Sequence, residues 1–247
     1  GRVITAITDA VTIRLLQRAE AQLGPPPVPY VWVAAGSQAR REQTARTDQD
    51  NCMVLSDDFD EGTHGAYFEA LARQVCDGLD ACGYVHCPGE MMAMTERWRQ
   101  PLTRWKQYFR HWTQSPEPTV LTSVFFDLRC VHGQASLLDA LRQEALQGSM
   151  ANGIFLAHMA NNALKRRPPL SVFGRISTAR SGEHRGTIDI KHLAIAPIVD
   201  LARIHALAGG LDAVNTDERL ASAGRSTAMS EQGARDLREA LEFLAAL

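Results

Sequence analysis

Two aspartates spaced two residues apart, Asp48 and Asp50, are the side chains of this chain whose type and spacing best suit metal chemistry. They begin the segment 48–55, whose remainder, Cys52-Met53-Val54-Leu55, is apolar enough to anchor a strand in a core. Side chains two residues apart on a strand point to the same face, so both carboxylates would project to one side. Such a pair suits Mg²⁺ or Mn²⁺, which take carboxylates together with substrate phosphates.

The dipeptide Gly36-Ser37 directly follows Tyr30 to Ala35, a short run of β-branched, aromatic and small residues that predicts a buried strand. Glycine adopts conformations that other residues avoid and lets backbone N–H groups approach an anion. The polar run 38–46 can begin a helix whose N-terminus favours phosphate. Three cations lie close to this point: Arg40, Arg41 and Arg46. A Gly-Ser turn is weak on its own, but with the aspartate pair it predicts a metal-dependent nucleotide site.

Asp127 is the candidate third carboxylate. It lies in the apolar run 121–131, which predicts another strand, and an ionised acid there is costly unless it is paired or coordinates metal. A third acid would complete a two-metal site for in-line phosphoryl displacement. A structural salt bridge, for instance to Arg129, explains the same residue equally well.

These motifs resemble the signature of the nucleotidyltransferase superfamily: Gly-Ser, a spacer carrying Arg-x-Glu-Gln, then Thr-Asp-Gln-Asp-Asn, within residues 36–51. More narrowly, the chain is similar to a family of bacterial nucleotidyltransferases related to the protein-PII uridylyltransferase of nitrogen signalling. Further matches to the family pattern are Cys87-Pro88-Gly89 with Met92-Ala93, the segment 98–112, Phe126 to Arg129 with Gly133, and the segments 188–191 and 197–203. In that family the domain commonly lies downstream of cyclic-nucleotide-binding and CBS modules. Because the chain begins with Gly1, we expect it to be part of a longer protein with upstream regulatory domains.

The resemblance implies a role for each position of the motif. Gly36 and Ser37 would hold the β- and γ-phosphates of a nucleoside triphosphate, and Asp48 and Asp50 would bind the metal ions. Asp127 would bind the second ion or orient the acceptor nucleophile, whose attack on the α-phosphorus releases pyrophosphate.

Two arginines beside the turn are candidates for charge neutralisation. Arg40 or Arg41 could neutralise the charge that develops on the phosphates, worth several kcal/mol in a pre-organised site. Glu42 could instead orient these arginines.

Lys191 is the candidate in the second half of the chain, where its ammonium group could reach the phosphates of the nucleotide. A salt bridge with Asp189 or Asp200 is an equally good interpretation. Asp200 and Arg203 lie three residues apart, and we expect them to pair on one helix face.

Composition limits the class of protein. A chain of 247 residues with 45% hydrophobic residues can bury a sizeable core. Its net charge of −2 gives no global basic field, which argues against a polynucleotide polymerase and a nucleic-acid partner. Five cysteines without a C-x-x-C pair indicate reduced thiols and a cytoplasmic location. We find no signal peptide or membrane-spanning apolar stretch and expect no membrane partner.

Hydrophobic periodicity predicts two domains. Residues 1–147 are predicted to form an α/β (α+β) domain with a small mixed sheet, and residues 148–247 an all-α helical bundle. The family resemblance implies that the first is a nucleotidyltransferase-like catalytic domain and that the second binds substrate. The first domain should contain helices 3–23, 63–82, 97–112 and 137–146 and strands 30–35, 48–55, 84–86 and 121–131. The second should contain helices 150–166, 197–208, 216–223 and 230–246, with a mobile loop at 171–187.

An aromatic stripe recurs at helical spacing between Trp98 and Trp112. Such a stripe is more often core than a surface for base stacking. A protein-interaction surface is a third interpretation, which could coexist with either.

We therefore expect a nucleotidyltransferase, of the uridylyl- or adenylyltransferase type, that moves NMP from NTP to an acceptor hydroxyl in bacterial signalling. A protein is the favoured acceptor, with small molecules and nucleic acids left open. A non-catalytic nucleotide-binding regulatory module, a sensor, is the alternative. The presence of all three carboxylates favours the enzyme.

Overall fold

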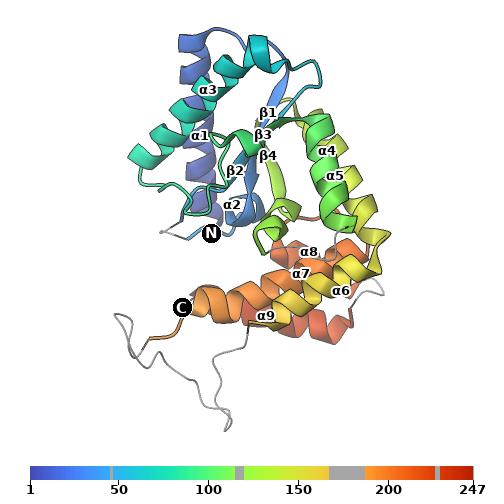
Figure 1. The fold of residues 1–247 in the computed structure, drawn as a ribbon. Helices are drawn as coiled ribbons and strands as arrows, with labels where there is room; N and C mark the ends of the chain where they lie inside the picture. Colours follow the sequence, from blue (N-terminus) through green and yellow to red (C-terminus); the bar gives the residue numbers. More distant parts are fainter. Residues whose placement is uncertain (45–46, 115–119, 167–186, 226–228, 247) are drawn as a thin grey trace. The chain divides into compact units, whose positions relative to one another are not determined.

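A computed structural model describes residues 1–44, 47–114, 120–166, 187–225 and 229–246 (Figure 1). The chain divides into two compact units, residues 1–114 with 119–148, and residues 149–247 with 115–118. Within the described ranges, no helix is both long enough and apolar enough to span a bilayer.

A four-stranded mixed sheet in the order β3-β2-β1-β4 forms the centre of the first unit. The central strand β1 (Tyr30–Ala35) pairs antiparallel with β2 (Asn51–Leu55) and with β4 (Leu128–Gly133), and β2 pairs parallel with the short β3 (Arg99–Pro101). Every residue of β1 and β2 is buried, as their uninterrupted apolar runs predicted. The predicted small mixed sheet in an α/β unit is confirmed, although β2 begins at Asn51 and not at Asp48.

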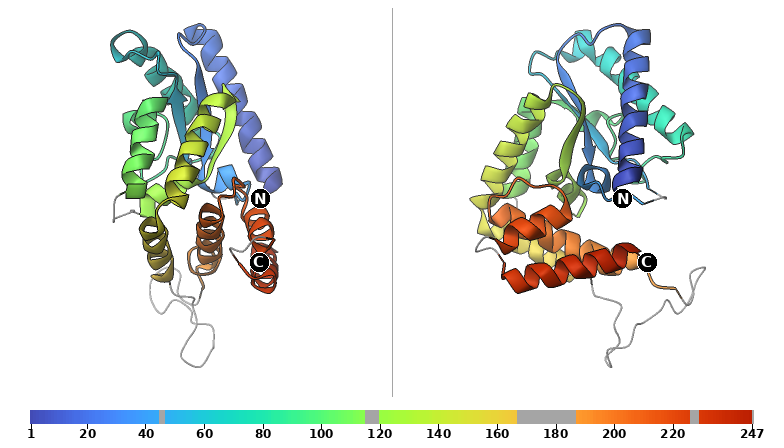
Figure 2. Two further views of the ribbon diagram at one scale, coloured as in Figure 1. Left: turned by 90° about the vertical axis from the view of Figure 1, so that its right-hand side faces the viewer. Right: turned by 180° about the vertical axis from the view of Figure 1, so that it is seen from behind.

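Helices cover both faces of this sheet. The helices α1 (Arg2–Leu23) and α3 (Glu61–Ala81) pack side by side on one face, and α4 (Leu102–Gln114) and α5 (Ala135–Met150) lie on the other (Figures 1 and 2). The core beneath α1 and α3 joins their apolar stripes to alternate residues of the strands, and its largest buried members include Leu16, Phe68, Leu71, Trp32, Met53 and Leu55. The predicted helices 3–23, 63–82 and 137–146 correspond to α1, α3 and α5.

The aromatic stripe is core. Trp105 is fully buried, and its indole Nε1 donates a hydrogen bond of 3.0 Å to the carbonyl oxygen of Met53 in β2. Trp98 and Trp112 are buried against Phe125, with ring centroids 4.4 and 5.7 Å away. The core interpretation is therefore confirmed over base stacking.

Three further predicted elements are wrong in type or extent. Residues 84–86 form no strand but run as a loop, in which the carbonyl oxygen of Tyr84 accepts a hydrogen bond from the Gln49 side chain. The predicted helix 97–112 begins only at Leu102, after a 3₁₀ turn (Glu96–Trp98) and β3. The apolar run 121–131 starts as a 3₁₀ helix (Val120–Phe126) because Phe125 is buried by aromatic packing and not by strand pairing. Periodicity does not distinguish these two ways of burying an apolar run.

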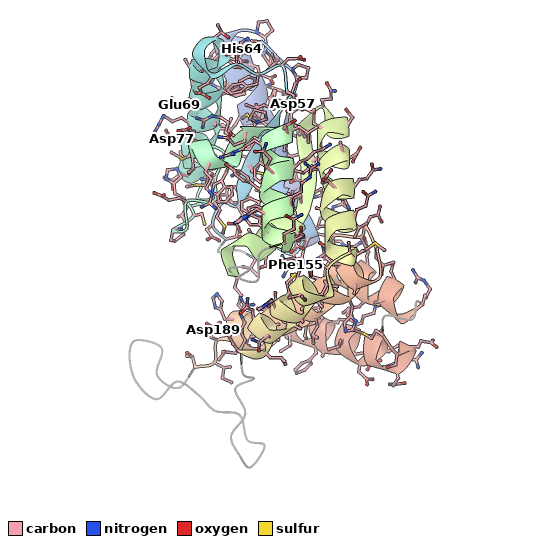
Figure 3. All side chains as sticks on the ribbon, turned by 45° about the vertical axis from the view of Figure 1, so that its right-hand side comes forward. Asp57, His64, Glu69, Asp77, Phe155 and Asp189 are labelled. Atoms are coloured by element: carbon pink, nitrogen blue, oxygen red, sulfur yellow. The ribbon has the colours of Figure 1, made fainter. Side chains whose placement is uncertain are left out.

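The acidic loop between β2 and α3 caps two helices. Asp57 accepts hydrogen bonds of 2.7 Å from the backbone N–H and the hydroxyl of Thr103 near the start of α4 (Figure 3). Asp60 caps α3 by accepting from the N–H of Thr63 at 3.0 Å. These carboxylates therefore stabilise the N-terminal turns of α3 and α4.

The described elements of the second unit are helical. They are α6 (Gly153–Leu164), a π-helical turn (Lys191–Ile195), α7 (Ala196–Ala208), α8 (Thr216–Gly224) and α9 (Glu231–Ala246). Ile198 and Ala202 of α7 and Leu220 of α8 form a buried cluster with apolar side chains of α9. The four predicted helices are confirmed. The all-α bundle stays a prediction, because residues 167–186, with nearly all of the predicted loop, lie outside the described part.

Candidate active site

The antiparallel pairing of β1 with both neighbours brings three distant parts of the chain to one end of the sheet. β1 ends at Ala35, where β2 and β4 begin, so Asp50 and Asp127 each directly precede a strand that flanks the turn. The N–H of Ala35 donates to the carbonyl oxygen of Asp50 at 2.9 Å, and the N–H of Gly36 donates to that of Asp127 at 3.1 Å. The structure therefore places the backbones of Gly36, Asp50 and Asp127 side by side.

The turn itself is the short helix α2 (Gly36–Arg40), which follows β1 without a loop. Gly36 has φ +56°, in the left-handed region that favours glycine. A Cβ atom on it would lie 2.8 Å from Cγ2 of Val124 and 3.0 Å from Oδ2 of Asp50. The missing side chain is thus what allows the Asp50 carboxylate to lie against the turn.

The side chains of residues 48–51 point alternately to opposite sides of the backbone, although only Asn51 belongs to β2. Gln49 and Asn51 are buried, and their side chains bond to α3 and to the loop that follows it. The Gln49 amide nitrogen donates to the carbonyl oxygens of Cys76 and Tyr84 at 2.9 and 2.8 Å, and the Asn51 side-chain oxygen accepts from the N–H of Ala93 at 2.8 Å. The intervening aspartates are left on the opposite side, as the two-residue period predicted.

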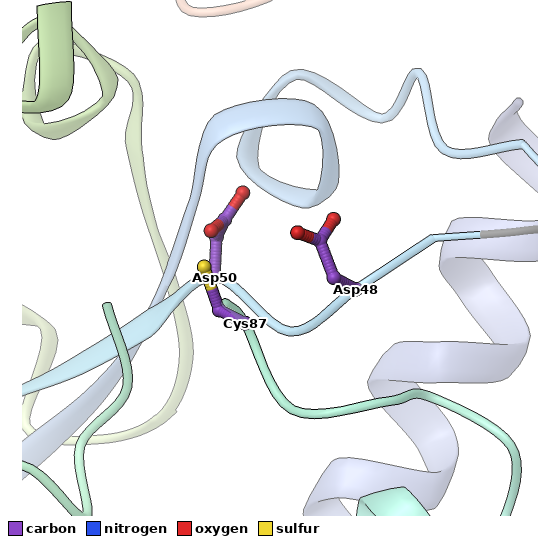
Figure 4. Close-up of side chains that lie close together, drawn as sticks. All are labelled: Asp48, Asp50 and Cys87. Atoms are coloured by element: carbon purple, nitrogen blue, oxygen red, sulfur yellow. The ribbon is translucent and has the colours of Figure 1, made fainter. Parts of the chain in front are cut away.

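Asp48, Asp50 and Cys87 form the acidic and thiol cluster at this point (Figure 4). One ligand atom from each lies within 4.8 Å of the other two. The aspartates are half-buried and Cys87 is buried. Two converging carboxylates fit a divalent cation, and in the described part of the chain Asp127 does not join this cluster.

The environment of the Cys87 thiol opposes its ionisation. Burial is the largest cause and raises the pKa of Cys87 to about 11, and the charges of Asp50 and Asp48 act in the same direction. Hydrogen bonds from the backbone of Met91 and Gly89 lower the pKa. Cys87-Pro88-Gly89 is a match to the family pattern, and no local pattern in the sequence predicts its place beside the aspartates.

Asp127 is fully buried and forms an ion pair. Its Oδ2 accepts a hydrogen bond of 2.5 Å from Nη1 of Arg40, whose Nε lies 2.7 Å from Oε2 of Glu42. The salt-bridge interpretation of Asp127 thus has Arg40 as its partner, and the suggested partner Arg129 was wrong. The pairing of Glu42 with Arg40 agrees with the orienting role considered for Glu42. The metal-binding role of Asp127 stays a prediction.

Arg129 fixes α2 in place instead. Its Nη2 lies 2.9 Å from Oδ1 of Asp9 in α1 and 3.0 Å from the carbonyl oxygen of Gln38. The Gln38 amide also donates to Asp9 at 3.0 Å. Asp9 therefore connects α1, α2 and β4, and the sequence did not predict these contacts because they join residues far apart in the chain.

The remaining predicted cations are Arg41, Arg46 and Lys191. Arg41 ends α2 and is exposed, and Arg46 falls outside the described residues. Lys191, in the second unit, is exposed at the start of its π-helical turn. Its phosphate-binding role stays a prediction.

The two acids suggested as salt-bridge partners of Lys191 bind other residues. Asp189 lies 2.8 Å from His192, and Asp200 lies 2.6 Å from both Arg166 and Arg203. The predicted pair of Asp200 with Arg203 is confirmed.

Two family models match this chain. The family model "Putative nucleotidyltransferase DUF294" matches residues 1–119, which include Gly36, Asp48, Asp50 and Cys87. The model "Putative nucleotidyltransferase substrate binding domain" matches residues 153–247. No curated protein matches the chain. The two matches together take in most of the chain's length and support a nucleotidyltransferase family for this chain.

Proposed function

We propose that this protein is a metal-dependent nucleotidyltransferase that moves NMP from a nucleoside triphosphate to an acceptor hydroxyl and releases pyrophosphate. One observation carries the proposal: the carboxylates of Asp48 and Asp50 converge beside a turn that has no side chain at Gly36. The family match supports nucleotidyl transfer as the reaction class.

The aspartate pair would bind the metal ion, and the turn would bind the phosphates of the nucleotide. Asp48 and Asp50 would hold Mg²⁺ or Mn²⁺, which when bound supplies a Lewis acid toward phosphoryl oxygens. Gly36 lets a phosphate approach the backbone closely, and the Ser37 hydroxyl lies next along the chain to contact the β- and γ-phosphates.

Three further residues would act on the acceptor and on the leaving group. Asp127 would bind a second ion or orient the acceptor hydroxyl, as a third carboxylate does in a two-metal site. Arg40 or Arg41 would stabilise the charge that develops on the departing pyrophosphate. Lys191 would add a cation from the substrate-binding region.

The biological setting is also part of the proposal. We infer a protein acceptor, a role in bacterial signalling under the control of upstream regulatory domains, and a cytoplasmic location. The family resemblance supports these inferences. All five cysteines are free thiols, which agrees with a reducing compartment.

Incorporation of label tests the function directly. Purified protein is incubated with each α-³²P-labelled NTP, Mg²⁺ or Mn²⁺, and a bacterial lysate, and compared with Asp48→Asn/Asp50→Asn. Glu69→Gln/Asp77→Asn, which removes two exposed charges from α3, is the matched control. Protein bands labelled by wild type and control but not by the aspartate variant are the expected result. Equal labelling by all three proteins contradicts the proposal.

A second candidate is a nucleotide-binding sensor without turnover. The pairing of Asp127 with Arg40 favours it, because that carboxylate is already neutralised by a guanidinium. This candidate predicts metal-dependent NTP binding by equilibrium dialysis with no label transferred to any acceptor.

A further inference from the structure

The aspartate pair has a sulfur donor beside it that a magnesium site does not need. Cys87 is buried, and its Sγ lies within 4.8 Å of one carboxylate oxygen of Asp48 and one of Asp50 (Figure 4). Mg²⁺ and Ca²⁺ bind oxygen donors, whereas thiolates select softer ions such as Zn²⁺, Cd²⁺ and Co²⁺. The donor set is therefore mixed, with two carboxylates and one thiol.

We propose that Asp48, Asp50 and Cys87 form a site for a thiophilic divalent cation of the Zn²⁺ class, which competes with Mg²⁺ for the two aspartates. The competition rests on the proposed function, in which the same carboxylates hold the catalytic ion. Binding of the thiophilic ion itself does not require nucleotidyl transfer.

The geometry needs little change to accept such an ion. In a tetrahedral site with Zn–S near 2.3 Å and Zn–O near 2.1 Å, the ligand atoms lie roughly 3.4–3.6 Å from one another. The three donors are already within 4.8 Å, so closure is a movement of about 1 Å, within reach of side-chain rotation. Three protein ligands leave the fourth position open, as in zinc sites that bind water or substrate.

The backbone holds Cys87 at this place. The N–H of Gln49 donates to the carbonyl oxygen of Val85 at 3.0 Å, and the N–H of Asn51 donates to that of Met91 at 3.1 Å. The N–H of Cys87 is directed to Sδ of Met92 at 3.4 Å. The loop that carries the thiol is thus bonded on both sides of Cys87 to the same segment that carries the aspartates.

Binding is a proton-for-metal exchange. The thiol releases its proton to solvent as the metal–sulfur bond forms, and the aspartates coordinate as carboxylates. The positive ion also relieves the repulsion between the thiolate and the two aspartates. No oxidant or reductant takes part.

Cobalt spectroscopy tests the site without nucleotide or turnover. Co²⁺ added to the wild-type protein should give a sulfur-to-cobalt charge-transfer band in the near ultraviolet, and Zn²⁺ should abolish it. Cys87→Ser should remove the band and weaken Zn²⁺ binding roughly 100-fold or more, since even outer-shell substitutions cost 10–100-fold. Cys82→Ser, which changes an exposed cysteine at the end of α3, should leave both unchanged.

The outcomes separate this site from the proposed reaction. If the wild-type protein gives no such band, or if Cys87→Ser retains it, the site does not exist, whatever the labelling assay shows. This wild-type measurement stands even if Cys87→Ser fails to fold. A second measurement is a Mg²⁺ titration with and without Zn²⁺. If the band depends on Cys87 but Zn²⁺ leaves the Mg²⁺ affinity unchanged, the two ions do not compete for the aspartates. Failure of nucleotidyl transfer alone leaves the cation site intact.

Discussion

Arg40 and Asp127 lie far apart in the sequence but form one ion pair in the first unit, with 2.5 Å between Nη1 and Oδ2. The carboxylate is fully buried and the guanidinium is 12% exposed, so the pair is shielded from solvent. It links the end of α2 to the residue before β4. The position of the turn therefore depends on the charge of Asp127.

Arg40→Gln should destabilise the protein by about 3 kcal/mol, because a buried carboxylate loses its cationic partner. Asp127→Asn should cost a similar amount. In urea unfolding, the double variant should cost clearly less than the sum of the two single changes. Additive losses would mean that the two groups act independently.

Gly36→Ala should lower both stability and metal affinity. The left-handed backbone costs about 1–2 kcal/mol for a residue with a Cβ, and that Cβ would displace the Asp50 carboxylate. Gly24→Ala is the matched control, because Gly24 has φ +92° but open space around its Cβ position. Thermal unfolding should show a loss in both variants, whereas Mn²⁺ titration should show one only in Gly36→Ala. Equal metal affinity in the two variants would refute the close contact.

Gln49→Leu should loosen the loop that carries Cys87. The carbonyl oxygens of Cys76 and Tyr84 lose their donor, at a cost of about 1–3 kcal/mol. We expect Co²⁺ affinity to fall roughly 10–100-fold, as for other residues that support metal ligands. Gln100→Leu removes a solvent-exposed hydrogen bond to the carbonyl oxygen of Glu96 and should change neither the stability nor the Co²⁺ affinity. Matching behaviour of the two variants would exclude a supporting role for Gln49.

Alkaline pH should destabilise the protein through Cys87. The folded pKa is raised from 9.0 to about 11, so the protonated thiol is favoured in the folded state. This contribution is fully present below pH 9 and is lost as the pH rises toward 11. Free energies of unfolding measured across this window should fall less steeply for Cys87→Ser than for wild type. Cys82→Ser should follow wild type, and an unchanged slope for Cys87→Ser would contradict the shift.

The sequence by itself determined the features that depend on neighbours along the chain. The uninterrupted apolar runs of β1 and β2 are typical of strands buried on both faces, so both elements could be predicted as strands. The common side of Asp48 and Asp50 follows from the two-residue period of extended backbone. The pair of Asp200 with Arg203 follows in the same way from helix geometry.

Only the tertiary structure decided the contacts between distant segments. Asp127 pairs with Arg40 and not with Arg129 because the register of β4 on β1 and the direction of α2 select the partner. Cys87 joins the aspartates because buried hydrogen bonds of Gln49 and Asn51 fold its loop against them. Val120–Phe126 forms a 3₁₀ helix because aromatic side chains from α4 cover it. Each outcome depends on which surfaces meet in space, and hydrophobicity along the chain does not carry that information.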